Sequence, residues 1–259
     1  LFYACRLAYD FRVHAIREYG SVIHEFDPWF HFRATEYLVE HGVAKFFTWF
    51  DHAAWYPLGR PVGTTIYPAM HLSAAAVHAL LVRFDSGWSL ADVCCHVPAW
   101  FGVLATVLTG ALARECAGQS AAAGAAAALV MAIVPAHLQR SVGGGFDNES
   151  VAISALVATF YCWCRALRTE RSWPYAAAAA LAYAYMAAAW GGYVFVINLV
   201  AAHAAALVLL GRPLAKVARA YSLFYGVGTA LATRVPVVGY TPLTSLEQLP
   251  PFLVFVAIG

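Results

Sequence analysis

Long apolar stretches separated by short polar connections dominate the chain beyond residue 92. Each stretch approaches the roughly 20 residues with which an α-helix crosses the hydrocarbon of a bilayer. The pattern therefore predicts an all-α fold, a polytopic transmembrane helical bundle. Small residues over 121–128, with Gly124 among them, predict close helix packing in the second stretch. The expected spans cover about 93–113, 120–138, 151–167, 173–190, 192–211 and 218–233, and a seventh begins near residue 250.

The first part of the chain follows a different pattern. Residues 1–17 are apolar but carry several charges, and we expect them to be the tail end of a first span. Residues 21–66 are polar, aromatic and rich in Pro and Gly, so they hold no window long enough to cross. Residues 67–84 are apolar but short and interrupted by polar side chains, which favours a helix in the membrane interface over a span. Residues 18–92 are therefore predicted to form a large first loop.

The connections between the expected spans alternate in basic content. By the positive-inside rule, the basic set of connections is cytoplasmic. The other set, which includes the glycine-rich segment 141–146, then faces the opposite side. If 67–84 lies in the interface, Asp27 and Asp147 share that side. The basic set comprises Arg114, then Arg165, Arg168 and Arg171, then Arg212, Lys216 and Arg219.

Composition supports a membrane protein and says little about partners. Hydrophobic residues make up 62% of the chain and charged residues 12%, whereas soluble domains are about 25% charged. The net charge of +2 gives no reason to expect a nucleic-acid partner. The six cysteines lack the paired spacing of a zinc site and are expected to pack in apolar surroundings. Because the chain starts at Leu1 and stops at Gly259 inside an apolar stretch, we expect it to be incomplete at both ends.

The glycine-rich segment carries the first candidate chemistry. Three consecutive glycines precede Asp147 and Glu149, and an apolar stretch begins immediately afterwards. Carboxylates at a bilayer edge are costly unless they are paired, hydrated or bound to a cation. Two interpretations stay open. The two acids could supply oxygen ligands to a hard divalent cation, or they could cap the following helix and interact with its dipole.

A second acidic segment lies far upstream, in His24-Glu-Phe-Asp-Pro-Trp-Phe30. Pro28 disfavours a helical conformation for the residue before it, so Asp27 is predicted to lie extended on a rigid turn. Trp29 and Phe30 are expected to seat this turn at the membrane surface. An Asp-Pro pair also simply initiates turns. Two acidic turns on one side nevertheless favour a shared metal site, and ligation by oxygen alone indicates Mg²⁺ or Mn²⁺.

Four further residues are candidates for catalysis or substrate contact. Arg140 lies seven residues before Asp147; it could orient the carboxylates, grip an anionic substrate through its planar guanidinium, or simply reach the interface. Trp190 and Tyr193 flank a Gly-Gly turn that allows a ligand to approach closely, although the sequence favours a plain tight hairpin as the explanation of this turn. Arg234 falls on the same side and is a further substrate-binding candidate.

Several longer stretches match a known family. The chain resembles the catalytic subunit of eukaryotic-type oligosaccharyltransferase in HEFDPWFHFRATEYL, WYPLGRPVGTTIYPAM, LQRSVGGGFDNES, WGGYVFVINL and VVGYTPLTSLEQL, in this order. The resemblance implies a membrane domain of the GT-C glycosyltransferase class over 1–259, in the endoplasmic reticulum membrane, with the first loop and the active site in the lumen. It also implies transfer of an oligosaccharide from a dolichyl diphosphate to the side-chain amide of Asn in Asn-X-Ser/Thr.

The resemblance also assigns residues and partners. It implies that Asp27, Asp147 and Glu149 line a site for Mg²⁺ or Mn²⁺, that Asp27 touches the acceptor amide, and that Arg140 supports the acidic cluster. The implied partners are the dolichyl-diphosphate-linked donor, the acceptor polypeptide, membrane lipids and further oligosaccharyltransferase subunits.

The chain departs from the family pattern in places. His31 and Phe32 stand where the family more often has Asn and Tyr, and Gly144-Gly145-Phe146 where it often has Gly-Ser-Tyr. The family's later lumenal loop with a catalytic Glu, and its C-terminal soluble domain with a Trp-Trp-Asp motif, have no counterpart here, so these 259 residues alone are expected to be inactive. Three alternatives remain: a multi-pass transporter or channel with an acidic ion site, a sister GT-C glycosyltransferase, and a truncated, non-catalytic member of the family.

Overall fold

The chain folds into helices, as the hydrophobic pattern predicts. The computed structural model describes residues 1–258, and within that range no β-strand forms. The α-helices are α1 (Phe2–Arg12), α2 (His14–Tyr19), α3 (Phe26–Phe46), α4 (Val62–Thr65), α5 (Ala69–Arg83), α6 (Leu90–Cys116), α7 (Ala121–Ile133), α8 (Pro135–Leu138), α9 (Asn148–Ala166), α10 (Pro174–Ala189), α11 (Tyr193–Leu209), α12 (Leu214–Ala232), α13 (Thr241–Thr244) and α14 (Leu249–Ile258), with 3₁₀ turns at Glu170–Ser172 and Leu246–Gln248.

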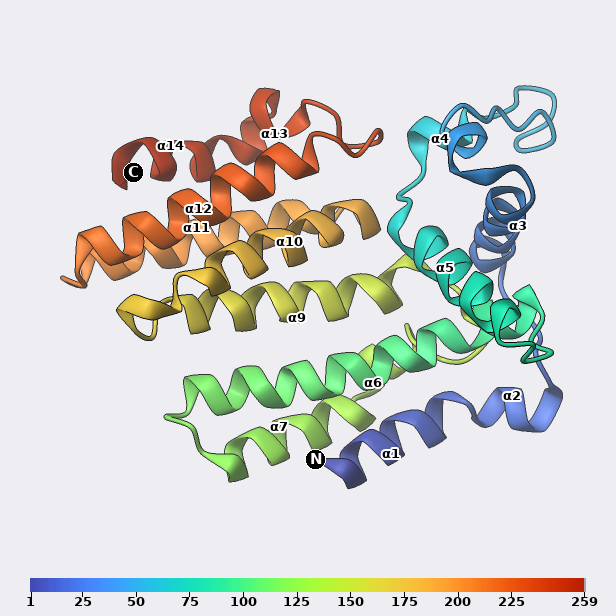
Figure 1. The fold of residues 1–259 in the computed structure, drawn as a ribbon, viewed down its shortest axis with the longest axis horizontal. Helices are drawn as coiled ribbons and strands as arrows, with labels where there is room; N and C mark the ends of the chain where they lie inside the picture. Colours follow the sequence, from blue (N-terminus) through green and yellow to red (C-terminus); the bar gives the residue numbers. More distant parts are fainter. Residues whose placement is uncertain (259) are drawn as a thin grey trace.

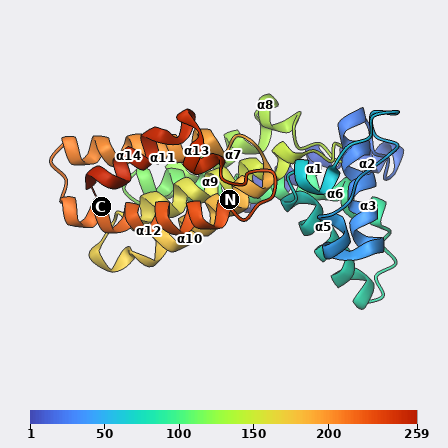
Figure 2. The ribbon, with the colours of Figure 1, turned by 90° about the horizontal axis from the view of Figure 1, so that it is seen from above.

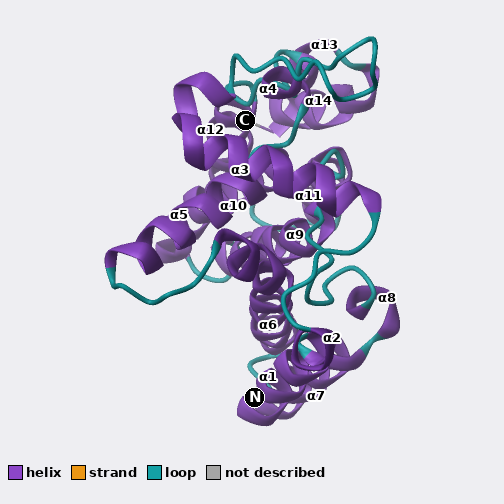
Figure 3. Ribbon diagram, turned by 90° about the vertical axis from the view of Figure 1, so that its right-hand side faces the viewer, coloured by secondary structure: helices purple, strands orange, loops and turns teal. Residues whose placement is uncertain are grey.

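Most of the longer helices lie side by side in one bundle. Helices α6, α7 and α9 to α12 run roughly parallel to one another, and α3 and α5 lie across one end of them (Figure 1). Viewed from above, the segment from α2 to α5 projects beyond that end (Figure 2). The view onto the same end shows helices connected by loops throughout (Figure 3). Much of the stretch predicted as a large first loop, 18–92, is therefore helical, and its helices α3 and α5 cap one end of the bundle.

Helices occupy every predicted span, but their lengths vary. Within residues 1–258, α6 alone, with 27 residues, is both long and apolar enough to cross a membrane. Ala69–Arg83, Ala121–Ile133, Tyr193–Leu209 and Leu246–Ile258 are apolar but shorter. The helix expected over 120–138 is interrupted, because Pro135 disfavours a helical residue before it: Val134 is extended and separates α7 from α8.

Small residues allow α6 and α7 to approach closely. A Cβ atom added to Gly110 of α6 would meet the carbonyl oxygen of Gly124 at 3.0 Å, and one added to Gly124 would meet that of Gly110 at 2.8 Å. Ala128 and Ala132 are buried in the same contact region, together with Ala4 and Ala8 of α1. The predicted packing role of the alanine-rich run is therefore confirmed.

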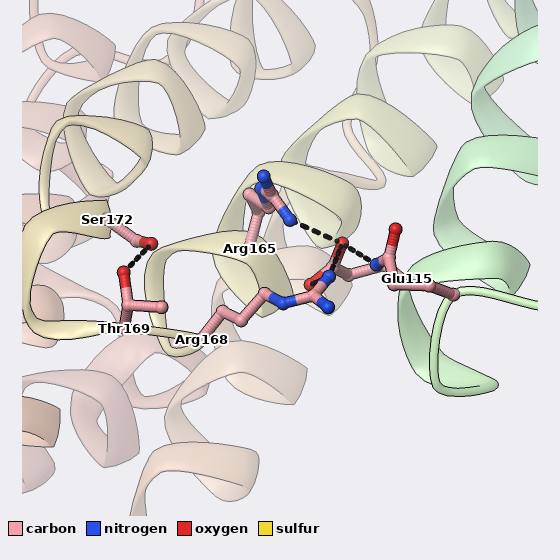
Figure 4. Close-up of polar contacts among 6 residues, drawn as sticks. Glu115, Arg165, Arg168, Thr169 and Ser172 are labelled. Atoms are coloured by element: carbon pink, nitrogen blue, oxygen red, sulfur yellow. Dashed lines mark hydrogen bonds and ion pairs between the residues drawn. The ribbon is translucent and has the colours of Figure 1, made fainter.

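An ion-pair network joins the end of α6 to the end of α9 (Figure 4). The side chain of Glu115 is only 8% exposed and accepts hydrogen bonds from Arg165 and Arg168, each at 3.1 Å. Gln119 donates a further bond of 2.7 Å to the same carboxylate. This network lies at the end of the bundle opposite the cap formed by α3 and α5 (Figure 1).

The conformation of the first acidic segment corrects the sequence prediction. Asp27 is not extended on a turn but lies in the first turn of α3, which begins at Phe26. The first N–H groups of a helix have no partner within the helix, so the missing N–H of Pro28 costs nothing at this position. Glu25 precedes the helix with a positive φ of 68° and sets the chain direction at its start.

Candidate acidic site

The two acidic segments meet in one cleft between the cap and the bundle. The cleft has a volume of about 290 Å³, and Asp27, Asp147 and Glu149 all line it. Asp27 is exposed, whereas the other two acids are half-buried. Its remaining lining residues are Phe30, His31, Arg60, Thr65, Ile66, Tyr67, Asn148 and Trp190.

Asp147 positions itself by capping the helix that follows it. One of its carboxylate oxygens accepts a hydrogen bond of 2.7 Å from the backbone N–H of Asn148, the first residue of α9. The hydroxyl of Ser150 donates to the Asp147 carbonyl oxygen at 2.7 Å. The capping interpretation is thus confirmed for Asp147. Capping does not exclude a ligand, because Asp147 also lines the cleft.

The glycines before Asp147 let the loop pack tightly under the site. The N–H of Gly143 donates to the carbonyl oxygen of Arg12 at 2.7 Å, and that of Gly144 donates to the carbonyl oxygen of Cys95 at 3.0 Å. Gly144 has a φ of 88°, a region that favours glycine. A Cβ atom at Gly143 would lie 2.5 Å from the Ile16 side chain. The loop is therefore held against both α1 and α6.

His31 joins the two acidic segments, although the sequence analysis assigned it no role. Its Nε2 atom lies 3.4 Å from Oδ1 of Asp147, and its Nδ1 atom lies 3.1 Å from Nε2 of His71. Nδ1 of His71 in turn lies 3.1 Å from the carbonyl oxygen of Tyr67. The sequence does contain a signal for this role. Asp27 and His31 are four residues apart, and residues at this spacing share one face of a helix.

The environments of Asp147 and Glu149 push their pKa values in opposite directions. Burial alone would raise the pKa of Asp147, but the contact with His31 and the N–H of Asn148 outweigh it, and the net shift is downward. Burial raises the pKa of Glu149, and repulsion from the Asp147 carboxylate raises it further. Arg140 opposes this rise through its positive charge. The pair therefore favours one ionised carboxylate beside one that is harder to ionise.

Arg60 is a second residue of the cleft that the sequence analysis did not select. Its guanidinium carbon lies 4.7 Å from the centre of the Phe30 ring and 5.1 Å from that of Trp55. Nε donates to the Thr65 hydroxyl at 3.1 Å. Partial burial lowers the pKa of Arg60, and the negative charge of Asp27 opposes that decrease. The cleft therefore holds, beside its acids, a positive charge that Asp27 stabilises.

The other predicted site residues divide into three groups. Trp190 lines the cleft. Arg140 is exposed outside the cleft lining but acts on Glu149 through its charge. Tyr193 and Arg234 are not among the lining residues: the Tyr193 side chain is buried and its hydroxyl accepts a hydrogen bond of 3.3 Å from Gln248, and Arg234 is exposed beyond the end of α12. Their predicted contacts with substrate stay predictions.

The donor atoms in the cleft are chemically suited to a divalent cation but do not form a compact cluster. In the part of the chain that the structure describes, no three His, Cys, Asp or Glu side chains are gathered closely enough to form a ready metal site. Carboxylate oxygens from Asp27, Asp147 and Glu149 nevertheless line one cleft. Asn148 also lines the cleft, and its Oδ1 atom is buried without a hydrogen-bond partner in the described residues. The donor set therefore fits a cation.

Solved structures define the class of fold. The crystal structure of the Archaeoglobus fulgidus oligosaccharyltransferase in its apo form matches 99% of this chain and 32% of its own, with a TM-score of 0.77 and 21% identity. The same enzyme in complex with Zn and sulfate gives a TM-score of 0.80, again at 21% identity, over 99% of this chain and 34% of the other. The helices therefore adopt the fold of an oligosaccharyltransferase membrane subunit.

Sequence comparison identifies the family. Residues 1–258 match the family model "Oligosaccharyl transferase STT3, N-terminal". The dolichyl-diphosphooligosaccharide--protein glycosyltransferase subunit stt-3 of Caenorhabditis elegans is 43% identical over 244 residues, 94% of this chain and 32% of that protein. The Dictyostelium discoideum subunit STT3 is 43% identical over 249 residues, 96% of this chain and 34% of that protein. The chain belongs to the STT3 family and spans about a third of the length of these relatives.

Proposed function

We propose that this chain forms the membrane part of an oligosaccharyltransferase active site. The reaction is transfer of an oligosaccharide from a dolichyl diphosphate to the side-chain amide of Asn in Asn-X-Ser/Thr. The observation that carries the proposal is the cleft that brings Asp27 together with Asp147 and Glu149 across 120 or so positions of sequence. Related structures support it: the Archaeoglobus fulgidus enzyme was solved with a dolichol-phosphate and an inhibitory peptide, and tethered to an acceptor peptide with an NVT sequon.

In this proposal Asp27, Asp147 and Glu149 hold a divalent cation, Mg²⁺ or Mn²⁺. Such a cation supplies positive charge that stabilises a departing diphosphate. The Zn complex of the archaeal enzyme supports a divalent ion in this fold without indicating which one. The orphan Oδ1 of Asn148 and the mutual repulsion of Asp147 and Glu149 are both features that a bound cation would relieve.

Asp27 has a second task in the proposal. An amide nitrogen is a poor nucleophile because its lone pair is delocalised into the carbonyl. Asp27 is exposed at the cleft and carries acceptor oxygens, so it can accept a hydrogen bond from the acceptor amide N–H and orient it. Arg140 places a positive charge near Glu149 from outside the cleft lining, and in the proposal it keeps the acidic cluster ionised.

We place the protein in the endoplasmic reticulum membrane with residues 18–92 and the cleft on the lumenal side. The basic connections at the opposite end of the bundle support this orientation. Acceptor polypeptide, membrane lipids and further oligosaccharyltransferase subunits are the proposed partners. In this placement the cap formed by α3 and α5 lies at the lumenal surface, where a lipid-borne donor and a soluble acceptor can meet.

The proposal is tested with Asp27→Ala in the full-length protein. Transfer of lipid-linked oligosaccharide to an Asn-X-Thr peptide should fall by about a hundredfold or more, the scale on which loss of one electrostatic group acts. Glu40→Ala is the matched control, because Glu40 is an exposed acid on the same helix and lies outside the cleft. Undiminished transfer by Asp27→Ala at saturating Mn²⁺ would remove Asp27 from the site.

A further inference from the structure

The two ring nitrogens of His31 have different surroundings: one contacts another histidine, and the other faces the carboxylate of Asp147. Nδ1 contacts His71 inside the protein. Nε2 lies on the cleft side, 3.4 Å from Oδ1 of Asp147. The residue is 8% exposed, so its ring has little freedom to rotate.

The hydrogen-bond chain behind His31 decides which nitrogen carries the proton. A carbonyl oxygen can only accept, so Nδ1–H of His71 donates to Tyr67. His71 is fully buried and makes no ion pair with a carboxylate in the described residues, which favours its neutral form. Its Nε2 is then an acceptor, and Nδ1–H of His31 must donate to it. In neutral His31 this leaves a lone pair on Nε2, directed to Asp147 and the cleft.

We propose that Nε2 of His31 is a nitrogen ligand of the divalent cation in the acidic cleft, next to a carboxylate oxygen of Asp147. The inference rests on the proposed function, which puts a cation there. Two ligand atoms that are each about 2.1 Å from one ion lie roughly 3 Å apart, close to the 3.4 Å that separates Nε2 from Oδ1. The Tyr67–His71–His31 chain is the outer-shell support that fixes a ligating imidazole.

A nitrogen ligand changes which cation the cleft prefers. Mg²⁺ is a hard ion that favours oxygen ligands, whereas imidazole suits transition metals. His31 therefore shifts the preference of this chain toward Mn²⁺ or Zn²⁺ and away from Mg²⁺. An asparagine at this position would offer an amide oxygen instead of a nitrogen. The preference for Mn²⁺ or Zn²⁺ over Mg²⁺ therefore depends on His31.

The competing arrangement is an ion pair. If His31 were protonated on both nitrogens, Nε2–H would donate to Asp147 and the imidazolium would hold that carboxylate without any metal. A donating Nε2–H is the form of the contact that lowers the pKa of Asp147, and a bound cation would replace this proton. The two arrangements differ in one observable: a directly bound imidazole nitrogen couples magnetically to a paramagnetic ion, whereas an imidazolium cannot bind one.

The experiment uses full-length protein in detergent, loaded with Mn²⁺ and measured by pulsed electron paramagnetic resonance. We expect a ¹⁴N modulation from a bound imidazole, and we expect it to change to the ¹⁵N pattern when all histidines are labelled with ¹⁵N. This labelling needs no substitution, so it stays informative if a variant misfolds. In His31→Asn the nitrogen signal should vanish, the Mn²⁺ affinity should fall by about tenfold, and the Mg²⁺ affinity should change by less than about threefold.

His41→Asn is the matched control, because His41 is exposed on the same helix and lies outside the cleft; it should keep the full signal. Bound Mn²⁺ without nitrogen modulation, or a modulation that persists in His31→Asn, overturns the inference and leaves the proposed acidic site intact. A protein that binds no Mn²⁺ overturns both the inference and the metal site of the proposed function. Peptide glycosylation, measured in parallel, tests the function separately.

Discussion

The guanidinium of Arg12 donates a hydrogen bond of 2.8 Å to the hydroxyl of Ser141, 129 positions further along the chain. Arg12 is fully buried, and its other N–H groups contact the carbonyl oxygens of Ala8 and Ala132, each at 2.9 Å, and Nδ1 of His137 at 3.0 Å. The Arg12 carbonyl oxygen also accepts from Gly143. One residue of α1 therefore fixes the start of the loop that carries Asp147 and Glu149.

Replacing Arg12 with Gln should destabilise the protein and disturb the acidic site together. The shorter side chain leaves several buried polar groups without partners, which costs about 2–4 kcal/mol of unfolding free energy. The loop then loses its support, so Mn²⁺ affinity should also fall. Thermal unfolding and metal titration in detergent measure the two effects. Arg6→Gln on the same helix is the control, because the Arg6 side chain is 72% exposed; equal effects of the two variants would contradict the assignment.

Gly102 provides the space through which Arg12 reaches this loop. A Cβ atom at Gly102 would lie 2.1 Å from Nε of Arg12. Gly102→Ala should therefore displace the guanidinium and lower the melting temperature, although Ala is the better helix former by about 1 kcal/mol. Gly226→Ala is a matched control within α12, because nothing lies within 4 Å of its added Cβ; its melting temperature should stay constant or rise. A stabilised Gly102→Ala would show that Arg12 can move freely.

The sequence predicts the helices and the proximity of the two acidic segments, but it does not predict the residues that join these segments to each other and to the bundle. Hydropathy predicts these helices because the length and apolar content of a stretch can be read from that stretch alone. Asp27 and Asp147 could be paired through topology, since alternating charge placed both on one side. The contact of Arg12 with Ser141 depends instead on the register between helices distant in sequence, which no local pattern encodes. Arg12 appeared in the sequence only as a charge in an apolar segment.

Two errors came from proline, whose effect depends on its position within an element. Pro28 was predicted to keep Asp27 extended, but in the first turn of α3 the helix tolerates it. Pro135 was passed over within a predicted span, yet it separates α7 from α8. The role of His31 is missed for a related reason: the helical spacing of Asp27 and His31 has meaning only if the segment is a helix, and Pro28 favours a turn.

Glu149→Gln should raise stability while weakening metal binding. The folded-state pKa of Glu149 lies above its ordinary value, so the stabilisation that its protonation gives is present below the unfolded pKa and is lost as pH rises through the folded pKa. At pH 7 the ionised carboxylate therefore opposes folding, and Gln removes that cost. In the presence of a chelator, the melting temperature of the variant should exceed that of the wild type at pH 7, and the difference should shrink toward pH 4.

Addition of Mn²⁺ should reverse the order, because the cation stabilises the wild type through Glu149 and the variant has lost that ligand. Differential scanning fluorimetry across pH, with and without Mn²⁺, measures both effects. Glu40→Gln, which removes an exposed acid on α3, should behave as the wild type throughout. A stability gain in Glu149→Gln that does not vary with pH would contradict the role given to ionisation.

Glu115 should stabilise the contact between the C-terminal ends of α6 and α9 without affecting metal binding at the acidic site. Its carboxylate is largely buried between Arg165 and Arg168 (Figure 4), so Glu115→Ala leaves two arginines without their shared partner and should cost about 1–2 kcal/mol of unfolding free energy. Arg114→Ala is the control, because Arg114 is exposed and makes no ion pair within residues 1–258.

A double-mutant cycle with Arg168→Ala isolates the ion pair from other losses. Because both residues belong to one network, the double variant should be more stable than the sum of the single effects predicts, by about 0.5–1 kcal/mol. High salt should reduce this coupling, since Arg168 is partly exposed. Mn²⁺ affinity should stay at the wild-type level in all three variants, because the network and the cleft lie at opposite ends of the bundle. Additive stabilities would show that the contact contributes no net coupling, and altered Mn²⁺ affinity would show that the two ends communicate.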